Sequence, residues 1–375
     1  MPGIYIHIPF CRSRCAYCDF YSTTREEVME DYVRALCQEI ENRKDELSHT
    51  RVRTIYIGGG TPSLLSHTSL NTILDVVYNH YDVDRDAEVT MEMNPDDCPL
   101  GRGAVNRVSL GIQSFDDSLL RLIRRRHDSA TAICAVRHLQ DAGIRNISID
   151  LISGLPGQTL ELWEHDLDTA FSLGVQHLSA YALSYEAGTL LTRWREEGRV
   201  REVSEELFVA MYERLCQRAR AAGFEHYEIS NFALPGFHSR HNSSYWTGEP
   251  YLGFGPGAHS YDGKRTRKAN RPRLDEYIQS WAYGSVCRDS IATKESLSLA
   301  DLYDEAVMCG LRTARGIDLH SIAERFGQSQ CDDLLRMAAP HLSAGRLVKN
   351  DGFLCLTEKS LMTSDDIMSD LMAID

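Results

Sequence analysis

The chain has 375 residues, enough to bury a large core, so small scaffolds that depend on disulfides are excluded. Its 40 basic and 54 acidic residues give a formal net charge of −14, which disfavours nucleic acid as a partner of the surface as a whole. No apolar run reaches the ~20 residues of a membrane span, and the start lacks the features of a signal peptide, so we expect a cytoplasmic protein.

Short β-branched runs alternate with amphipathic segments through the first two thirds of the chain. In the first amphipathic segment Val28, Tyr32 and Leu36 recur every four residues, as one face of a helix requires. The alternation predicts α/β architecture with parallel strands, and six βα units favour a partial (β/α)6 barrel. The expected strands are residues 3–8, 54–57, 89–93, 107–112, 147–152 and 177–183; the expected helices are residues 25–47, 66–78, 129–142, 159–173 and 204–222.

The first five expected strands are each followed by, or end in, a polar or glycine-rich motif. In chain order these motifs are CRSRCAYCDF, GGGTPS, EMNPDD, GIQSF and DLISGLPGQ. The carboxyl ends of the strands meet at one end of a barrel, where such folds carry their chemistry. The five motifs therefore predict a single site.

The last third of the chain changes character. A turn-rich, aromatic segment at residues 229–262 has no clear period, and we interpret residues 236–292 as loop and linker covering the barrel mouth. From residue 293 the pattern predicts helices and then a hairpin around Asn350-Asp351-Gly352, an order that resembles a winged helix. An excess of acidic residues there argues against DNA binding. The expected domains are a barrel at 1–235, the covering region at 236–292 and a smaller α+β domain at 293–375.

Three of the eleven cysteines, Cys11, Cys15 and Cys18, lie within eight residues of one another. Three thiolates at this spacing can ligate three irons of a 4Fe-4S cluster, leaving the fourth iron open to the amino and carboxylate groups of S-adenosylmethionine (SAM). Spacing alone also allows a zinc site completed by His7 or another residue. We interpret the other cysteines as small hydrophobes in a reducing compartment: Cys37, Cys98, Cys134, Cys216, Cys287, Cys309, Cys331 and Cys355.

The flanking sequence extends the cysteine motif. IYIHIPFCRSRCAYCDFYS resembles the opening of the radical SAM group that includes coproporphyrinogen dehydrogenases and HemW-type haem chaperones, and GGGTPSLL, EMNPD, GIQSF, DLISGLPGQT, EISNFA, HNSSYW and GFGPGAHS also match. One departure is Arg124, where relatives often have glycine. The resemblance implies a 4Fe-4S cluster on the three cysteines and SAM bound by Tyr5, Tyr17, Gly59, Gly60, Thr61, Glu92, Gln113, Arg125 and Asp150.

Two motifs distinguish between members of this group. Decarboxylating members usually read CxxxCxxCxC, whereas this chain has Phe20 two positions after the last cysteine. The pattern CxxxCxxCxF, which ends at Phe20, and the HNxxYW motif at residues 241–246 resemble the corresponding motifs of the haem chaperones. The resemblance implies haem binding by His241, Tyr245 and Trp246, because imidazole can ligate iron and aromatic rings can pack on the macrocycle. His238 and His259 are alternative ligands.

We therefore expect a haem chaperone that passes haem to acceptor haemoproteins, with respiratory enzymes among the candidates. It is expected not to act as a coproporphyrinogen oxidase, while SAM cleavage stays open. The resemblance also allows a homodimer. One alternative is oxygen-independent conversion of coproporphyrinogen III to protoporphyrinogen IX. Another is a zinc-binding, winged-helix interaction protein without redox chemistry.

Overall fold

The computed structural model describes residues 2–47, 50–97, 103–285 and 287–373, and Cys98 lies outside these ranges. Within them, six parallel strands run in chain order through the centre of a twelve-stranded sheet. These strands are β1 (Gly3–Ile8), β2 (Val52–Gly59), β3 (Val83–Met93), β4 (Arg107–Gln113), β5 (Asn146–Ser153) and β6 (His177–Ala182). The predicted partial barrel is confirmed.

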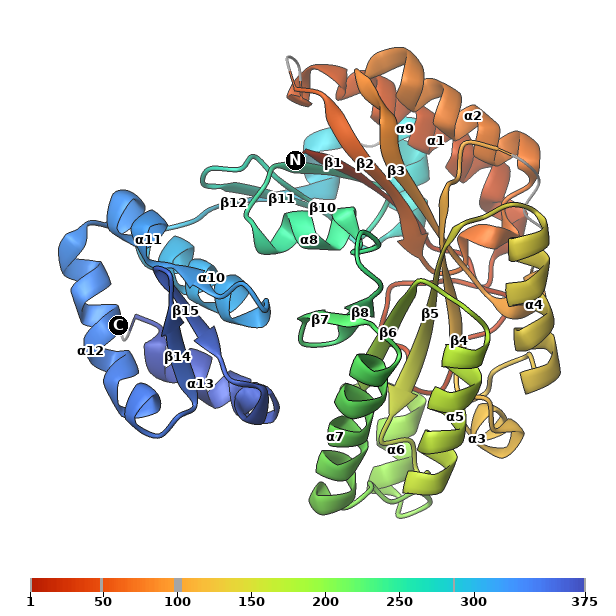
Figure 1. The fold of residues 1–375 in the computed structure, drawn as a ribbon. Helices are drawn as coiled ribbons and strands as arrows, with labels where there is room; N and C mark the ends of the chain where they lie inside the picture. The colour runs from red at the N-terminus through yellow and green to blue at the C-terminus, as the bar shows by residue number, and fades with distance from the viewer. Residues whose placement is uncertain (1, 48–49, 98–102, 286, 374–375) are drawn as a thin grey trace.

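Helices cover the outer face of this sheet (Figure 1). They are α1 (Met29–Asn42), α2 (His67–His80), α4 (Ser129–Asp141), α5 (Leu160–Ser172) and α7 (Glu205–Ala221). The last four begin where the side chain of Ser66, Asp128, Thr159 or Ser204 accepts a hydrogen bond from a backbone N–H of the first turn. Such side chains satisfy donors that the helix itself leaves unpaired, which is why the sequence located these starts closely.

Short elements that the sequence did not predict extend both edges of the sheet. β9 (Tyr251–Phe254) pairs in parallel with β1, and β8 (Asn231–Ala233) pairs antiparallel with β6. The remaining edge strands are β7 (Glu225–Glu228), β10 (His259–Tyr261), β11 (Thr266–Asn270) and β12 (Ala292–Ser296). The unpredicted helices are α3 (Asp117–Leu122), α6 (Leu190–Glu196), α8 (Arg240–Trp246) and α9 (Leu274–Trp281). Elements this short span too few residues to display a period.

The expectation that residues 236–292 form loop over the barrel mouth is wrong. The HNSSYW motif forms α8, and the segment also supplies strands to the sheet. Glu88 in β3 accepts hydrogen bonds from the first two backbone N–H groups of α8, and Thr54, near the start of β2, hydrogen-bonds to His241. The helix therefore lies toward the amino ends of the strands. By contrast, the loop that carries Cys11, Cys15 and Cys18, which we call the cysteine loop, follows the carboxyl end of β1.

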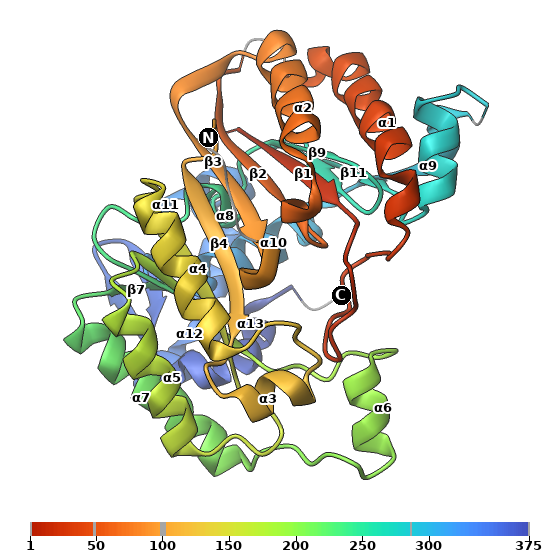
Figure 2. The same cartoon turned by 90° about the vertical axis from the view of Figure 1, so that its right-hand side faces the viewer.

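The C-terminal part has its own hydrophobic core and a three-stranded sheet, and it lies on the side of the large sheet opposite the outer helices (Figures 1 and 2). Its order of elements is that of a winged helix, as predicted. Asp351 and Gly352 have φ of 47° and 86° and make the tight turn of the predicted hairpin. The elements are α10 (Leu299–Arg312), β13 (Ile317–Asp318), α11 (Leu319–Phe326), α12 (Gln328–Ser343), β14 (Leu347–Asn350), β15 (Phe353–Leu356) and α13 (Ser364–Leu371).

Of the helices in the described part of the chain, none combines the length and apolarity needed to cross a membrane. Short 3-10 turns complete the secondary structure, at Glu26–Val28, Lys44–Leu47, Pro62–Leu64, Pro95–Asp97, Arg288–Ile291 and Glu358–Thr363. The boundaries proposed between the three domains stay predictions.

Candidate functional site

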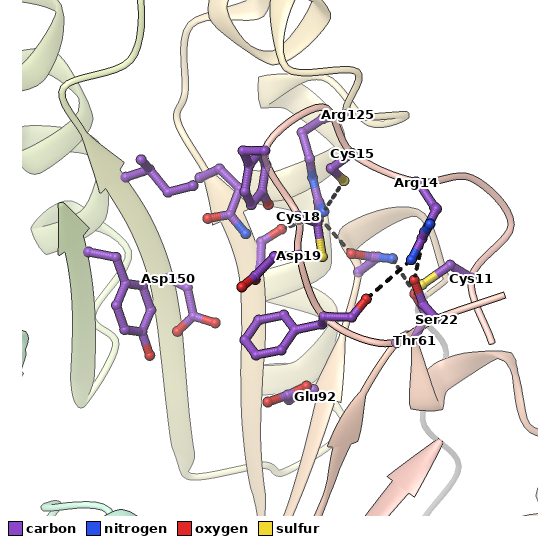
Figure 3. Close-up of a pocket in the computed structure, with 18 of the residues that line it drawn as sticks. Cys11, Arg14, Cys15, Cys18, Asp19, Ser22, Thr61, Glu92, Arg125 and Asp150 are labelled. Carbon is purple, nitrogen blue, oxygen red and sulfur yellow. Dashed lines mark hydrogen bonds between the residues drawn. The ribbon is translucent and has the colours of Figure 1, made fainter. Parts of the chain in front are cut away.

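One pocket of about 430 Å³ opens where the cysteine loop meets the carboxyl ends of the strands (Figure 3). It brings together nearly all the side chains predicted for a cluster and SAM: Cys11, Cys15, Tyr17, Cys18, Gly59, Gly60, Thr61, Glu92, Gln113, Arg125 and Asp150. Tyr5 does not line it; its hydroxyl hydrogen-bonds to Nδ1 of His7 at 3.0 Å, and its ring stacks on Tyr56. The expected convergence of the strand ends is therefore present, with Tyr5 beneath the pocket.

Two thiols of the cysteine loop accept hydrogen bonds, one from a residue that follows β2 and one from a residue that follows α3. Thr61 Oγ1 donates to Cys11 Sγ at 3.4 Å, and Arg125 Nη1 donates to Cys15 Sγ at 3.3 Å. Burial raises the pKa of Cys11, and it raises the pKa of Cys18 to about 11. These thiols are therefore mostly protonated at neutral pH in the free protein, and a bound metal centre would have to displace their protons.

Arg125 is held by backbone and side-chain oxygens beside the cysteines. Its Nη2 donates to Asn94 Oδ1 at 2.6 Å and to the carbonyl of Gly111, while its Nε is buried without a hydrogen-bond partner among the described residues. The preceding Arg124 has φ of 60°, a left-handed conformation that glycine adopts at lower cost. Glycine, which the family resemblance led us to expect at this position, would adopt this conformation with less strain.

Two half-buried carboxylates, Glu92 on β3 and Asp150 on β5, face the pocket from the strands, as Figure 3 shows. Glu92 accepts hydrogen bonds from the Tyr56 hydroxyl at 2.8 Å and from the Gly59 backbone N–H at 2.9 Å. Asp150 accepts from the Ser109 hydroxyl at 3.1 Å. Burial raises the pKa of Asp150 and raises that of Glu92 to about 6. Both groups are placed to receive a cationic or hydroxyl-bearing ligand.

The glycines of the site allow close approach. A Cβ atom at Gly60 would lie 2.6 Å from the Phe10 carbonyl oxygen, and one at Gly58 would lie 2.9 Å from the Glu92 carboxyl carbon. Real Cβ atoms do not come so near to a backbone oxygen, so at position 60 only glycine permits this packing against the cysteine loop, whereas at position 58 the Glu92 side chain would have to move.

His241 is separate from this pocket. Its side chain is 1% exposed, and its ring nitrogens hydrogen-bond to Thr54 Oγ1 and Tyr245 Oη, each at 2.8 Å. Burial lowers its pKa to about 3, so the ring is neutral. Tyr56 stacks on it at 5.1 Å and reaches Glu92 through its hydroxyl. His241 thus packs near the amino ends of the strands, and Tyr56 contacts both His241 and the pocket residue Glu92.

The other residues proposed for haem do not share an open space with His241, although Tyr245 contacts it directly. Tyr245 and Trp246 line a second cavity, between α8 and the C-terminal domain. His238 is bonded to Glu225 at 2.7 Å, and His259 is exposed. The structure therefore does not gather the predicted haem residues around one open space.

Sequence reasoning missed several residues of the first pocket. Asn94 belongs to the EMNPDD motif that was noted, yet its contact with Arg125 was not foreseen. Ser109 could have been found from the two-residue period of β4, since it shares a face with Gly111 and Gln113. Tyr181 lines the pocket from β6, but no motif marked it.

Known proteins resemble this chain over nearly its whole length. The model of the radical SAM superfamily matches residues 5–170, and that of the HemN C-terminal domain matches residues 297–362. A Bacillus subtilis protein named "Heme chaperone HemW" is 36% identical, covering 98% of each chain. This chain belongs to the HemW family. The HemW of Escherichia coli K12 is 38% identical over 72% of this chain and 74% of its own.

The solved structure of coproporphyrinogen III oxidase, HemN, from Escherichia coli has the same fold. It matches with a TM-score of 0.83 and 22% identity, covering 99% of this chain and 90% of its own. Membership of the radical SAM superfamily implies a 4Fe-4S cluster and SAM. The pocket fits both groups, since it combines three thiols, two half-buried carboxylates and the Nε of Arg125, which has no hydrogen-bond partner among the described residues.

Among the residues that the structure describes, no three His, Cys, Asp or Glu side chains converge closely enough to hold a single metal ion. The zinc and iron contents of the purified protein therefore distinguish a zinc site from an iron–sulfur cluster.

We expect SAM to bind less tightly in acid. Because the pKa of Glu92 is raised to about 6, its carboxylate becomes protonated as the pH falls from 7 to 5 and loses its attraction for cationic SAM. Affinity should fall about tenfold over this range. Anaerobic equilibrium binding to the cluster-loaded protein measures the effect. Glu92→Gln should bind weakly with little pH dependence, and an unchanged pH dependence in this variant would contradict the role of Glu92.

Proposed function

We propose that this protein is a cytoplasmic haem chaperone that binds haem and transfers it to acceptor haemoproteins. The observation that carries the proposal is the 36% identity to a protein named "Heme chaperone HemW" over 98% of both chains. Respiratory haemoproteins are candidate acceptors, and a homodimer is compatible with the proposal.

In this proposal Cys11, Cys15 and Cys18 ligate three irons of a 4Fe-4S cluster, with the fourth iron open to SAM. When bound, the two groups supply one-electron chemistry. Thr61 and Arg125 stabilise the thiolates through the hydrogen bonds that already join them to Cys11 and Cys15.

Further residues orient SAM in the proposal. Glu92 and Asp150 receive its ammonium group and ribose hydroxyls, and Arg125 receives its carboxylate. The backbone at Gly59, Gly60 and Thr61 contacts its methionine part, because the two glycines have no side chains that would obstruct it. Tyr17 stacks on the adenine. Gln113 contacts the ribose, while Tyr5 supports the pocket from below.

Phe20 favours the chaperone over the decarboxylating enzyme. Its side chain is 65% exposed and lines the cluster pocket at the position where decarboxylating relatives have an additional thiol. A phenyl ring can neither ligate a metal nor transfer a proton. The proposed cluster therefore keeps its three ligands, while the additional thiol chemistry is absent.

The proposal is tested by titrating haemin into the cluster-loaded protein under anaerobic conditions. We expect saturable binding with a shifted Soret band, followed by spectral transfer of the haem to an apo-haemoprotein. Binding that does not saturate, or haem that never leaves the protein, would contradict the chaperone. Formation of protoporphyrinogen from coproporphyrinogen with SAM and a reductant would identify the oxidase instead.

A further inference from the structure

A groove between the barrel and the C-terminal part carries no role in the site described above. It has a volume of about 510 Å³, within the range of small-molecule sites, and α8 and β9 face α10 and α11 across it. Helix α8 also contacts α10 directly. We call this cavity the interdomain groove.

One wall of the interdomain groove is aromatic. The rings of Tyr245 and Tyr251 lie 4.7 Å apart and nearly perpendicular, and Tyr261 follows at 6.4 Å from Tyr251. Trp246 has the Arg312 guanidinium 4.7 Å from its ring centre, and its Nε1 is buried with no hydrogen-bond partner among the described residues. Such a wall suits a large planar aromatic ligand with polar edges.

The opposite wall carries sulfur. Leu302, Ala306 and Cys309 are spaced along one face of α10, and all three line the groove. Burial raises the pKa of the Cys309 thiol, with Glu305 acting in the same direction and Arg267 and Arg312 opposing it. A thiolate is a known axial ligand of haem iron. His241, by contrast, would have to give up a hydrogen bond to Thr54 or Tyr245 before it could ligate.

Arginines surround the groove and match the carboxylates of a porphyrin. Arg267 is paired with Glu305 at 3.0 Å. Arg315 and Arg325 lie over the rings of Phe353 and Phe326, and neither has a carboxylate partner in the described part of the chain.

Acidic residues line the groove as well. Asp318 caps α11 and Glu305 is paired with Arg267, while Glu249, which also lines the groove, has an interaction partner of its own. The two exposed arginines thus remain available for a pair of propionates.

We propose that haem binds in the interdomain groove, with its ring against Trp246 and Tyr251, Cys309 as an axial ligand, and Arg315 and Arg325 on its propionates. This inference rests on the proposed function, and it assigns a binding site to the haem that the chaperone would carry. As the iron–sulfur bond forms, the Cys309 proton leaves to solvent and no electron is transferred, so ferric haem stays ferric.

Haemin titration of the full-length, cluster-loaded protein tests this placement. Cys309→Ser should shift the Soret band and weaken binding about tenfold, because the thiolate ligand is lost. The matched control is Cys216→Ser, a buried thiol outside the groove, which should bind as the unaltered protein does. The double variant Arg315→Gln, Arg325→Gln should bind about tenfold more weakly with an unchanged Soret position.

The outcomes separate the groove from the function. Failure of the unaltered protein to bind haemin would overturn the proposed function. Saturable binding that neither the Cys309 nor the arginine variants alter, or that only His241→Ala abolishes, would keep the function and overturn the groove. Since Arg315 and Arg325 are exposed, their variant keeps the test valid even where the Cys309 variant folds poorly.

Discussion

Replacing Cys11, Cys15 and Cys18 together by alanine is expected to abolish the iron and sulfide content of the protein and its brown colour. The three thiols are the cysteines that line the pocket, and two of them already accept hydrogen bonds that would stabilise a thiolate. Without them a 4Fe-4S cluster would have no protein ligands there. Iron, zinc and sulfide analysis after anaerobic reconstitution, together with visible absorbance, measures the loss.

The matched control replaces three cysteines away from the pocket, Cys134, Cys287 and Cys355, none of which is buried. This variant should keep its full cluster. Stoichiometric zinc without sulfide in the unaltered protein would instead support the zinc-binding alternative. Equal loss of iron in both triple variants would contradict the assignment of the ligands.

Acid is expected to destabilise the fold through His241. Its pKa is lowered to about 3 by burial, whereas an unfolded histidine titrates near pH 6.5, so below that pH the unfolded chain binds a proton that the folded chain does not. Stability is therefore lost as the pH falls from about 6.5 toward 3. Between pH 7 and 5 this loss amounts to about 2 kcal/mol. The buried His177, whose pKa is also lowered by burial, acts in the same direction.

The measurement compares urea unfolding free energies at pH 7 and pH 5 for the unaltered protein and His241→Gln. Glu92 and Asp166, whose pKa values burial raises to about 6, oppose the effect but are common to both proteins. The unaltered protein should lose about 2 kcal/mol more than the variant. The control is His320→Gln, at a histidine whose side chain is 82% exposed, and it should lose as much stability as the unaltered protein does. Equal losses in the unaltered protein and His241→Gln would show that His241 does not stay neutral in the fold.

Much of the cluster pocket could be predicted because its residues are local to strand ends. Cys11, Cys15 and Cys18 lie within eight residues, and each further motif follows its own strand. Parallel strands in chain order bring such motifs together whatever the details of packing. Tyr5 is the exception, because its place within β1 directs it to Tyr56 and His7 rather than into the pocket.

The haem residues could not be placed in the same way. His241 bonds to Thr54, which lies 187 positions away in the chain, and Tyr251 belongs to a strand that joins the sheet beside β1. The interdomain groove needs Trp246 and Cys309 to meet across two parts of the chain. Neither a local hydrophobic period nor a short motif predicts contacts between residues so far apart in the sequence.

The sequence by itself determined the six parallel strands, the helix starts with their capping side chains, the hairpin near the C-terminus and the cysteine loop. These features follow from local hydrogen bonding and from periods of two or four residues. Only the tertiary structure decided that α8 packs at the amino ends of the strands, that His241 is buried and fully bonded, and that a groove opens beside it. Those properties depend on which segments, far apart in the sequence, pack against one another and exclude water. Such burial is a property of the packed chain and not of any one segment.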